Sequence, residues 1–411
     1  MLGDRPTVFE WAIAPLKLIP MSVAQLNLTC RAERVKKFGN NEHIWIVMLR
    51  PTYRIPKLPP AGELETAAVL REAAHAHRHL AELKGRARSI PNQAILIDTL
   101  ALQEAKASSE VENIVTTQDE LFQASLHWDG AGSPAAKEVA SYRDALKRGY
   151  DQLHANQGLL TNNVIIEMFQ VLKRTDEGFR ATPGTALRNQ GTGEIVYVPP
   201  QDRAEIEAQM AALETFINDD AASDLDPLVK MALIHHQFES IHPFSDGNGR
   251  IGRILNVLYL TRVGLLEIPV LYLSRYVTAN KADYYRMLQS VRDNGDWEPW
   301  LLYMLRAVST TSRHTLALID GMSALMAAYK QGLRQHATIR YSQDLLNNLF
   351  RHPYTRIEFL QKDLDVTRQT AAKYLDQLTV AGFVEKHQAG RNNYYINRPL
   401  VDLLMQVSDG G

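Results

Sequence analysis

Hydrophobic residues recur every three to four positions along most of the chain, which is the spacing of amphipathic helices. One strand-like signal interrupts this pattern before residue 383: Gly193 precedes the run 194–198, which ends at Pro199-Pro200 and predicts a small β-hairpin. The chain is therefore expected to be mainly α. The pattern predicts helices over residues 64–74, from Pro91-Asn92 onward, and over 135–171, 204–218, 227–241, 249–263 and 281–292.

The C-terminal part has a different order of elements. Helical patterns over 345–349, 356–360 and 367–378 are followed by strand-like runs at 383–386 and 393–396, which flank a turn at 388–391. Three helices and a two-stranded wing predict a winged helix-turn-helix domain. Its candidate nucleic-acid contacts are Thr367, Arg368, Gln369 and Lys373 on the second helix of the motif and Arg391 on the wing.

Composition sets the broad class. The 411 residues are 45% hydrophobic and 22% charged, which predicts a folded protein of two to three domains. With a net charge of -1, the chain has no overall positive field to attract a nucleic acid or an anionic membrane, so any such binding must come from a local basic patch. Residues 335–400 carry nine Lys/Arg against six Asp/Glu, a surplus too small to decide between DNA and protein as the partner of this module.

Cys30 is the single cysteine, so the chain has no internal disulfide and no thiolate zinc site. A reducing compartment follows, and no run reaches the ~20 apolar residues of a membrane helix. We therefore expect a cytoplasmic protein without membrane contact. Residues 1–50 show no sustained periodicity, which predicts either a disordered extension or an irregular docked arm.

One segment gathers the reactive groups: His242-Pro-Phe-Ser-Asp246-Gly-Asn-Gly-Arg250-Ile-Gly-Arg253. A glycine-containing loop that enters a helix N-terminus presents free amides and the positive end of the helix dipole to an anion. Arg250 and Arg253 add donors suited to phosphate, and Asp246 adds a hard oxygen for Mg²⁺. His242 has a pKa suited to taking a proton. These groups favour phosphoryl or nucleotidyl transfer.

Alternative metal sites fit less well. An EF-hand loop from Asp246 fails because Arg250 stands at position 5 and Val257 at position 12. No Walker-type lysine pattern occurs. His235, Glu239 and His242 stand at i, i+4 and i+7, which leaves a zinc hydrolase as a disfavoured alternative because the His-Glu-x-x-His form is missing.

Residues 242–253 resemble the signature of the Fic (Fido) family, His-x-Phe-x-Asp/Glu-Gly-Asn-Gly-Arg-x-x-Arg, at every fixed position. The resemblance implies a Fic/Fido helical core with the hairpin as a flap. It implies transfer of AMP from ATP to a Ser, Thr or Tyr hydroxyl of a protein, including the enzyme itself, with release of pyrophosphate. His242 would be the general base and Asp246 the Mg²⁺ ligand. The implied nucleotide-binding residues are Asp246, Gly247, Asn248, Gly249, Arg250, Ile251, Gly252 and Arg253, with Tyr284 and Tyr285 near the adenine.

A second motif, Ser108 to Asn113, resembles the family's inhibitory sequence Ser/Thr-x-x-x-Glu-Gly/Asn. Glu112 beside Arg253 would neutralise the guanidinium meant for the γ-phosphate. The combined order resembles stand-alone bacterial Fic adenylyltransferases over residues 51–405. We expect an extension at 1–50, a helical arm with the inhibitory helix at 51–134, a catalytic core at 135–310 and the winged helix at 335–405.

Two other functions stay open at this point. One is a DNA-binding regulator whose Fic core senses nucleotide, and the other is removal of AMP from a modified protein, with Glu112 aligning a water molecule. The sequence does not identify the target protein. It also leaves open the oligomeric state, a homodimer included, and whether Glu112 acts within one chain or across an interface.

Overall fold

The computed structural model describes residues 53–117, 120–121, 133–188, 192–336, 338–389 and 392–409. The predicted extension at 1–50 and Cys30 lie outside these residues. The chain divides into two units, residues 1–54 and residues 55–411. In the described part of the chain, no helix is long and apolar enough to cross a membrane.

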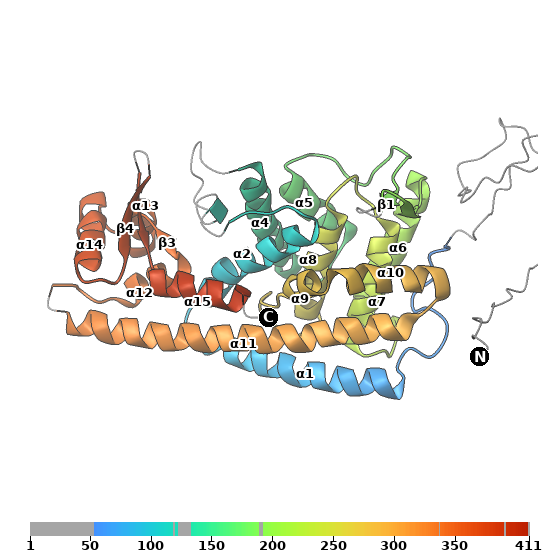
Figure 1. Cartoon of the computed structure of the whole chain (residues 1–411), viewed down its shortest axis with the longest axis horizontal. Helices are drawn as coiled ribbons and strands as arrows, with labels where there is room; N and C mark the ends of the chain where they lie inside the picture. The colour runs from blue at the N-terminus through green and yellow to red at the C-terminus, as the bar shows by residue number, and fades with distance from the viewer. Residues whose placement is uncertain are drawn as a thin grey trace, which may run out of the picture. The chain divides into compact units, whose positions relative to one another are not determined.

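The second unit is mainly helical, as the hydrophobic pattern predicts (Figure 1). Its centre is formed by two helices, α7 and α8, and nearly every residue of both is buried. Because both helices are buried along nearly their whole length, they form the core around which the others pack, and their buried polar side chains need partners there. The elements up to this core are α1 (Ala67–Ala87), α2 (Gln93–Val111), α4 (Pro134–Ala155), α5 (Asn162–Lys173), α6 (Arg203–Asn218), the 3₁₀ turn η2 (Asp220–Ala222), α7 (Pro227–Ile241) and α8 (Asn248–Arg262).

The helical pattern predicted over 135–171 corresponds to two helices, α4 and α5, in the structure. The break lies where Gln157 and Gly158 adopt positive φ values of 56° and 87°, which an α-helix does not tolerate. The Thr161 side chain then accepts the backbone N–H of Val164 and caps α5. The break places α4 and α5 side by side, with their ends toward the reactive segment.

The predicted hairpin is present. Strand β1 (Leu187–Arg188) pairs antiparallel with β2 (Ile195–Tyr197), and Leu187 lies opposite Tyr197. The Tyr197 hydroxyl donates to the backbone carbonyl of Ser240 at 2.8 Å, so one strand of the hairpin is fixed to the end of α7. The hairpin thus stands beside the segment that carries His242.

A 39-residue helix, α11 (Trp297–Gln335), follows α9 (Leu273–Ala279) and α10 (Lys281–Asn294). It runs parallel to α1 and packs along it (Figure 1): Glu72 meets Arg306, His79 meets Ser309 and Arg86 meets Asp320. It continues without a break past residue 310, where the sequence predicts that the core ends. The helix therefore connects the core with the C-terminal module.

The C-terminal module contains the predicted three helices and wing. Its sheet has the order β3-β5-β4 with antiparallel pairing throughout, and β3 is too short to leave a sequence pattern. The first wing strand extends to Ala389, into the segment predicted as a turn. The elements are α12 (Gln343–Arg351), β3 (Tyr354–Thr355), α13 (Ile357–Leu364), α14 (Arg368–Val380), β4 (Glu385–Ala389), β5 (Asn392–Ile396) and α15 (Arg398–Asp409).

Asp98 of α2 ties this module to the rest of the unit. Its carboxylate lies 2.8 Å from Lys147 Nζ on α4 and 2.6 Å from Arg351 Nε on α12. Burial would raise the pKa of Asp98, but the two cations outweigh it and hold the pKa below its usual value. The same helix α2 therefore contacts the C-terminal module near one end and the candidate site at the other.

Candidate active site

The reactive segment forms a fixed turn between α7 and α8. The helix α7 ends at His242, whose φ of 50° is left-handed and whose N–H donates to Phe238 O at 2.9 Å. The Asn248 side chain then closes the turn from both sides: Oδ1 accepts the N–H of Phe244 and Nδ2 donates to its carbonyl, each at 2.9 Å. Gly247 adopts φ 77° at the N-cap of α8. The Asn248 side chain thus stabilises the backbone conformation of this turn.

His242 is partly buried, and its backbone carbonyl accepts a hydrogen bond from Arg180 Nε at 2.9 Å. Burial lowers the pKa of His242 to about 3, and the positive charges of Arg292 and Arg180 act in the same direction. Within the described part of the chain, its Nδ1 has no hydrogen-bond partner. The imidazole is therefore neutral at physiological pH and able to accept a proton.

Two buried arginines stand at the N-terminus of α8. Arg250 is 1% exposed and Arg253 is 3% exposed, so each needs a carboxylate close by. Glu112 contributes to both: its Oε1 lies 2.8 Å from Arg253 Nη2, and its Oε2 lies 3.3 Å from Arg250 Nε. The carboxylate also approaches the helix end closely, since a Cβ on Gly249 would lie 2.4 Å from Glu112 Oε1. Glu112 therefore stands where the free amides and the dipole of α8 favour an anion.

The other positions of the inhibitory motif have their own contacts. Ser108 Oγ accepts from Arg253 Nε at 2.8 Å, and its carbonyl accepts from Nη2 at the same distance. Asn113 takes φ 63° just past the end of α2, and the N–H of Ile114 closes the turn on Ser109 O at 3.0 Å. A left-handed position favours glycine or asparagine, which accounts for Asn at this place.

A second carboxylate, that of Glu138 on α4, forms ion pairs with Arg250 and Lys173. Its Oε1 lies 2.6 Å from Arg250 Nη1 and 2.8 Å from Lys173 Nζ, and Lys173 Nζ lies 2.7 Å from Asp246 Oδ2. The sequence did not point to Glu138 or Lys173, because single charges on amphipathic helices carry no motif. These two residues extend the site onto α4 and the end of α5.

Asp246 projects from the turn with its side chain 62% exposed. Burial would raise the pKa of Asp246, but Lys173 and Arg250 outweigh it and hold the pKa below its usual value. The exposed, ionised oxygen fits a Mg²⁺ ligand. Among the described residues, no cluster of three His, Cys, Asp or Glu side chains could hold a metal alone. Phosphate oxygens and water would have to complete such a site.

The two tyrosines of α10 have different positions. Tyr284 is 2% exposed, and His235 Nε2 lies 2.8 Å from its hydroxyl, so it belongs to the core. Tyr285 is 46% exposed.

Asn256 Nδ2 lies 3.0 Å from His235 Nδ1, and burial lowers the pKa of His235 to about 3. This histidine is therefore a neutral core residue with two partners, which argues against the zinc-hydrolase alternative.

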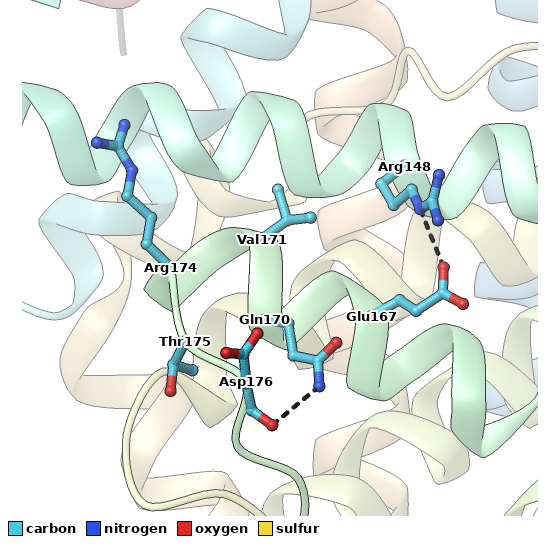
Figure 2. Close-up of a pocket in the computed structure, with 7 residues that line it drawn as sticks. All are labelled: Arg148, Glu167, Gln170, Val171, Arg174, Thr175 and Asp176. Atoms are coloured by element: carbon cyan, nitrogen blue, oxygen red, sulfur yellow. Dashed lines mark hydrogen bonds and ion pairs between the residues drawn. The ribbon is translucent and has the colours of Figure 1, made fainter.

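A surface groove of about 450 Å³ lies elsewhere, over α4 and the end of α5 (Figure 2). In Figure 2, Arg148 pairs with Glu167 across it, at 2.9 Å between Nε and Oε2. It contains none of the residues predicted from the reactive segment. The groove is lined by Arg148, Glu167, Gln170, Val171, Arg174, Thr175 and Asp176.

Comparison with known proteins gives three matches to family models. The Fic/DOC family N-terminal model matches residues 70–151, and the Fic/DOC family model matches residues 159–260. The model for the C-terminal domain of SoFic-like protein adenylyltransferases matches residues 325–400. The three matches lie in order along the chain, and the second contains the whole reactive segment.

Individual relatives are more distant. A protein adenylyltransferase Fic of Nematostella vectensis is 27% identical over 254 residues, which is 61% of this chain and 51% of that protein. Protein adenylyltransferase fic-1 of Caenorhabditis briggsae is 33% identical over 116 residues, 28% of this chain and 20% of the relative. The chain thus spans about half, or less, of the length of these relatives.

The fold is similar to that of a solved structure. The crystal structure of a Fic family protein from Desulfovibrio desulfuricans G20 superposes with a TM-score of 0.51 at 21% identity. The match covers 83% of this chain and 98% of that one.

Proposed function

We propose that this chain, which belongs to the Fic/DOC family, is a protein adenylyltransferase that transfers AMP from ATP to a Ser, Thr or Tyr hydroxyl and is autoinhibited by Glu112. The observation that carries the proposal is the position of Glu112, whose carboxylate occupies the anion site at the α8 N-terminus and binds both arginines. Similarity to proteins named as protein adenylyltransferases supports the activity.

The chemistry follows from the groups around the turn. The α8 amides, Arg250 and Arg253 would bind the triphosphate, and Asp246 would hold Mg²⁺, which neutralises phosphate charge. The target hydroxyl gives its proton to His242 as its oxygen bonds to the α-phosphorus. The bond from that phosphorus to the oxygen bridging to the β-phosphate breaks, and pyrophosphate leaves. The products are an AMP-modified side chain and pyrophosphate.

The hairpin β1–β2 supports a protein as the acceptor. It stands beside His242, and in the described part of the chain its sheet has two strands, to which an extended target segment could add as a third by backbone hydrogen bonds. Such pairing would bring a hydroxyl side chain of the target, or of another part of this chain, toward the imidazole.

Inhibition by Glu112 has an electrostatic basis. A γ-phosphate and the Glu112 carboxylate cannot both pair with Arg250 and Arg253, because two negative charges held at this separation repel strongly. ATP must then bind without its γ-phosphate on these arginines. Its α-phosphorus is displaced from the line of attack, which slows the transfer.

The test is transfer of label from α-labelled ATP in the presence of Mg²⁺. We expect weak self-labelling of the wild type, stronger labelling of Glu112→Gly and none of His242→Ala. Glu110→Gly is the matched control for the first variant, because it changes the same helix end but a residue that pairs with Lys106. His154→Ala, on the surface, is the control for the second.

Equal labelling of wild type, Glu112→Gly and His242→Ala would contradict the proposal. Label carried over from γ-labelled ATP would indicate phosphate transfer instead. Loss of label from a pre-modified protein in the absence of ATP, faster in wild type than in Glu112→Gly, would favour AMP removal.

A further inference from the structure

Glu239 of α7 is a buried carboxylate without a partner. It is 7% exposed, and its Oε1 has no hydrogen-bond partner among the described residues. It lies one helical turn before His242 and packs against α8, where a Cβ on Gly252 would lie 2.9 Å from Oε1. A buried acceptor left unsatisfied costs about 1–3 kcal/mol, so such a position calls for an explanation.

The surroundings of Glu239 belong to the candidate site. Burial raises the pKa of Glu239 to about 7; the charge of Arg253 opposes this rise and Glu112 adds to it. Burial raises the pKa values of Tyr284 and Tyr285 on α10, and the charge of Glu239 adds to both rises. Glu239 therefore interacts electrostatically with Arg253, which Glu112 binds, and with both tyrosines of α10.

The chemistry of an unpaired carboxylate limits what it can bind. In its ionised form the carboxylate accepts hydrogen bonds and repels phosphate oxygens, so it favours a donor of the ligand over the triphosphate as its partner. A nucleotide with its phosphates on the α8 N-terminus carries donors at its other end, namely the ribose hydroxyls and the amino group of the base. A hydrogen bond from one of these donors would satisfy Oε1.

We propose that Glu239 binds the nucleoside part of the substrate by accepting a hydrogen bond from a sugar hydroxyl or a base amino group. The inference rests on the proposed function, since it takes a nucleoside triphosphate as the ligand. It gives the site a selecting residue outside the phosphate-binding loop, because a site built to accept a hydrogen bond rejects analogues that lack the donor.

The experiment measures equilibrium binding by calorimetry with the full chain carrying Glu112→Gly, which opens the arginines. The ligands are ATP, 2′-deoxy-ATP, 3′-deoxy-ATP and purine riboside triphosphate, which lacks the amino group. Each is titrated into this parent and into the same chain with Glu239→Gln or Glu239→Met. Glu207→Met on the parent is the matched control, since Glu207 is exposed and pairs with Arg203 on the surface of α6.

We expect one of the three analogues to bind the parent roughly tenfold more weakly than ATP, as the loss of a charge-assisted hydrogen bond implies. The analogue that does so identifies the donor. In Glu239→Met, the affinity for ATP should fall by a similar factor, and the difference in affinity between ATP and that analogue should disappear. Glu239→Gln, which keeps an acceptor, should lie between the two.

ATP affinity and analogue discrimination that are the same in the parent, Glu239→Met and Glu207→Met would overturn this inference alone. Failure of the Glu112→Gly parent to bind ATP would overturn the proposed function as well. Both results are read from binding and do not depend on transfer activity. Thermal unfolding of each variant distinguishes lost binding from lost structure.

Discussion

Glu112 Oε1 lies 2.8 Å from Arg253 Nη2, across 141 positions of sequence, while the other oxygen of the same carboxylate faces Arg250. One side chain thus offsets two buried guanidinium groups. Because Glu112 stands at the C-terminal end of α2, anything that shifts this helix end alters both pairs together. Substitutions of the residues that hold this helix end should therefore change the inhibition by Glu112.

Ser108→Ala should partly release the inhibition. The hydroxyl accepts from Arg253 Nε, and hydrogen bonds to charged groups contribute about 1.5–3 kcal/mol, part of which the retained carbonyl contact offsets. We expect basal labelling from ATP to rise by roughly three- to tenfold, and less than in Glu112→Gly. Ser109→Ala is the control, because Ser109 is equally buried but its Oγ has no hydrogen-bond partner among the described residues. Equal responses of the two serines would contradict this role for Ser108.

The left-handed conformation of Asn113 gives a second test. Ala at φ 63° is strained by about 1 kcal/mol, whereas Gly adopts this conformation freely. Asn113→Ala should therefore loosen the end of α2 and increase hydrogen exchange there, with a rise in basal labelling. Asn113→Gly should keep the backbone turn. Lys281→Ala accompanies both, because it removes the 2.7 Å bond from Lys281 Nζ to Asn113 Oδ1 without altering the backbone.

Glu138→Gln should destabilise the fold without touching the inhibitory helix. Lys173 and Arg250 hold the pKa of Glu138 below its usual value although burial opposes this, so its ionised form stabilises the native state. We expect a loss of about 1–2 kcal/mol in the free energy of unfolding at pH 7, measured in urea. Because the folded pKa is lowered, this difference should persist down to about pH 4.5 and vanish as the pH falls through the folded value. Glu207→Gln, at an exposed pair, should change little. A deficit that is the same at pH 3 and pH 7 would contradict the ion-pair explanation.

The sequence predicts the core helices and the residues of the turn well, because both rest on local signals. The apolar positions of α7 and α8 and the fixed spacing from His242 to Arg253 need no knowledge of distant contacts. Glu112 also follows from a motif. The pairing of Glu138 with Arg250 joins residues 112 positions apart, and nothing local marks either partner for the other. Such contacts appear once helices pack.

The long helix α11 shows a different reason for a missed element. Its interior contains Gly321 and Gly332, which lower helix propensity and weaken any prediction from sequence alone. In the fold, each glycine lies against an aromatic or aliphatic side chain of the C-terminal module: a Cβ on Gly321 would be 2.8 Å from Leu403 Cδ1, and one on Gly332 would be 3.0 Å from Phe383 Cζ. These glycines are positions of close approach in a continuous helix.

Glu104 gives a prediction on stability that is independent of any activity. It is buried on α2, accepts from Tyr142 and from the Ser274 N–H and hydroxyl, and burial raises its pKa to about 7, although Ser274 and Arg253 oppose the rise. The unfolded state titrates near the ordinary value, so between about pH 4.5 and 7 the native state binds more protons. The contribution of Glu104 to stability therefore falls as the pH rises through this window.

Glu104→Gln removes the titration while it keeps the size of the side chain and an acceptor. Its free energy of unfolding relative to wild type should rise with pH from about 4.5 and level off above 7, by up to about 3 kcal/mol. Urea unfolding at several pH values measures this difference, with Glu207→Gln as the pH-independent reference. A difference that stays constant from pH 4.5 to pH 8 would mean that Glu104 keeps an ordinary pKa in the fold, and that Arg253 stabilises its charge fully despite the burial.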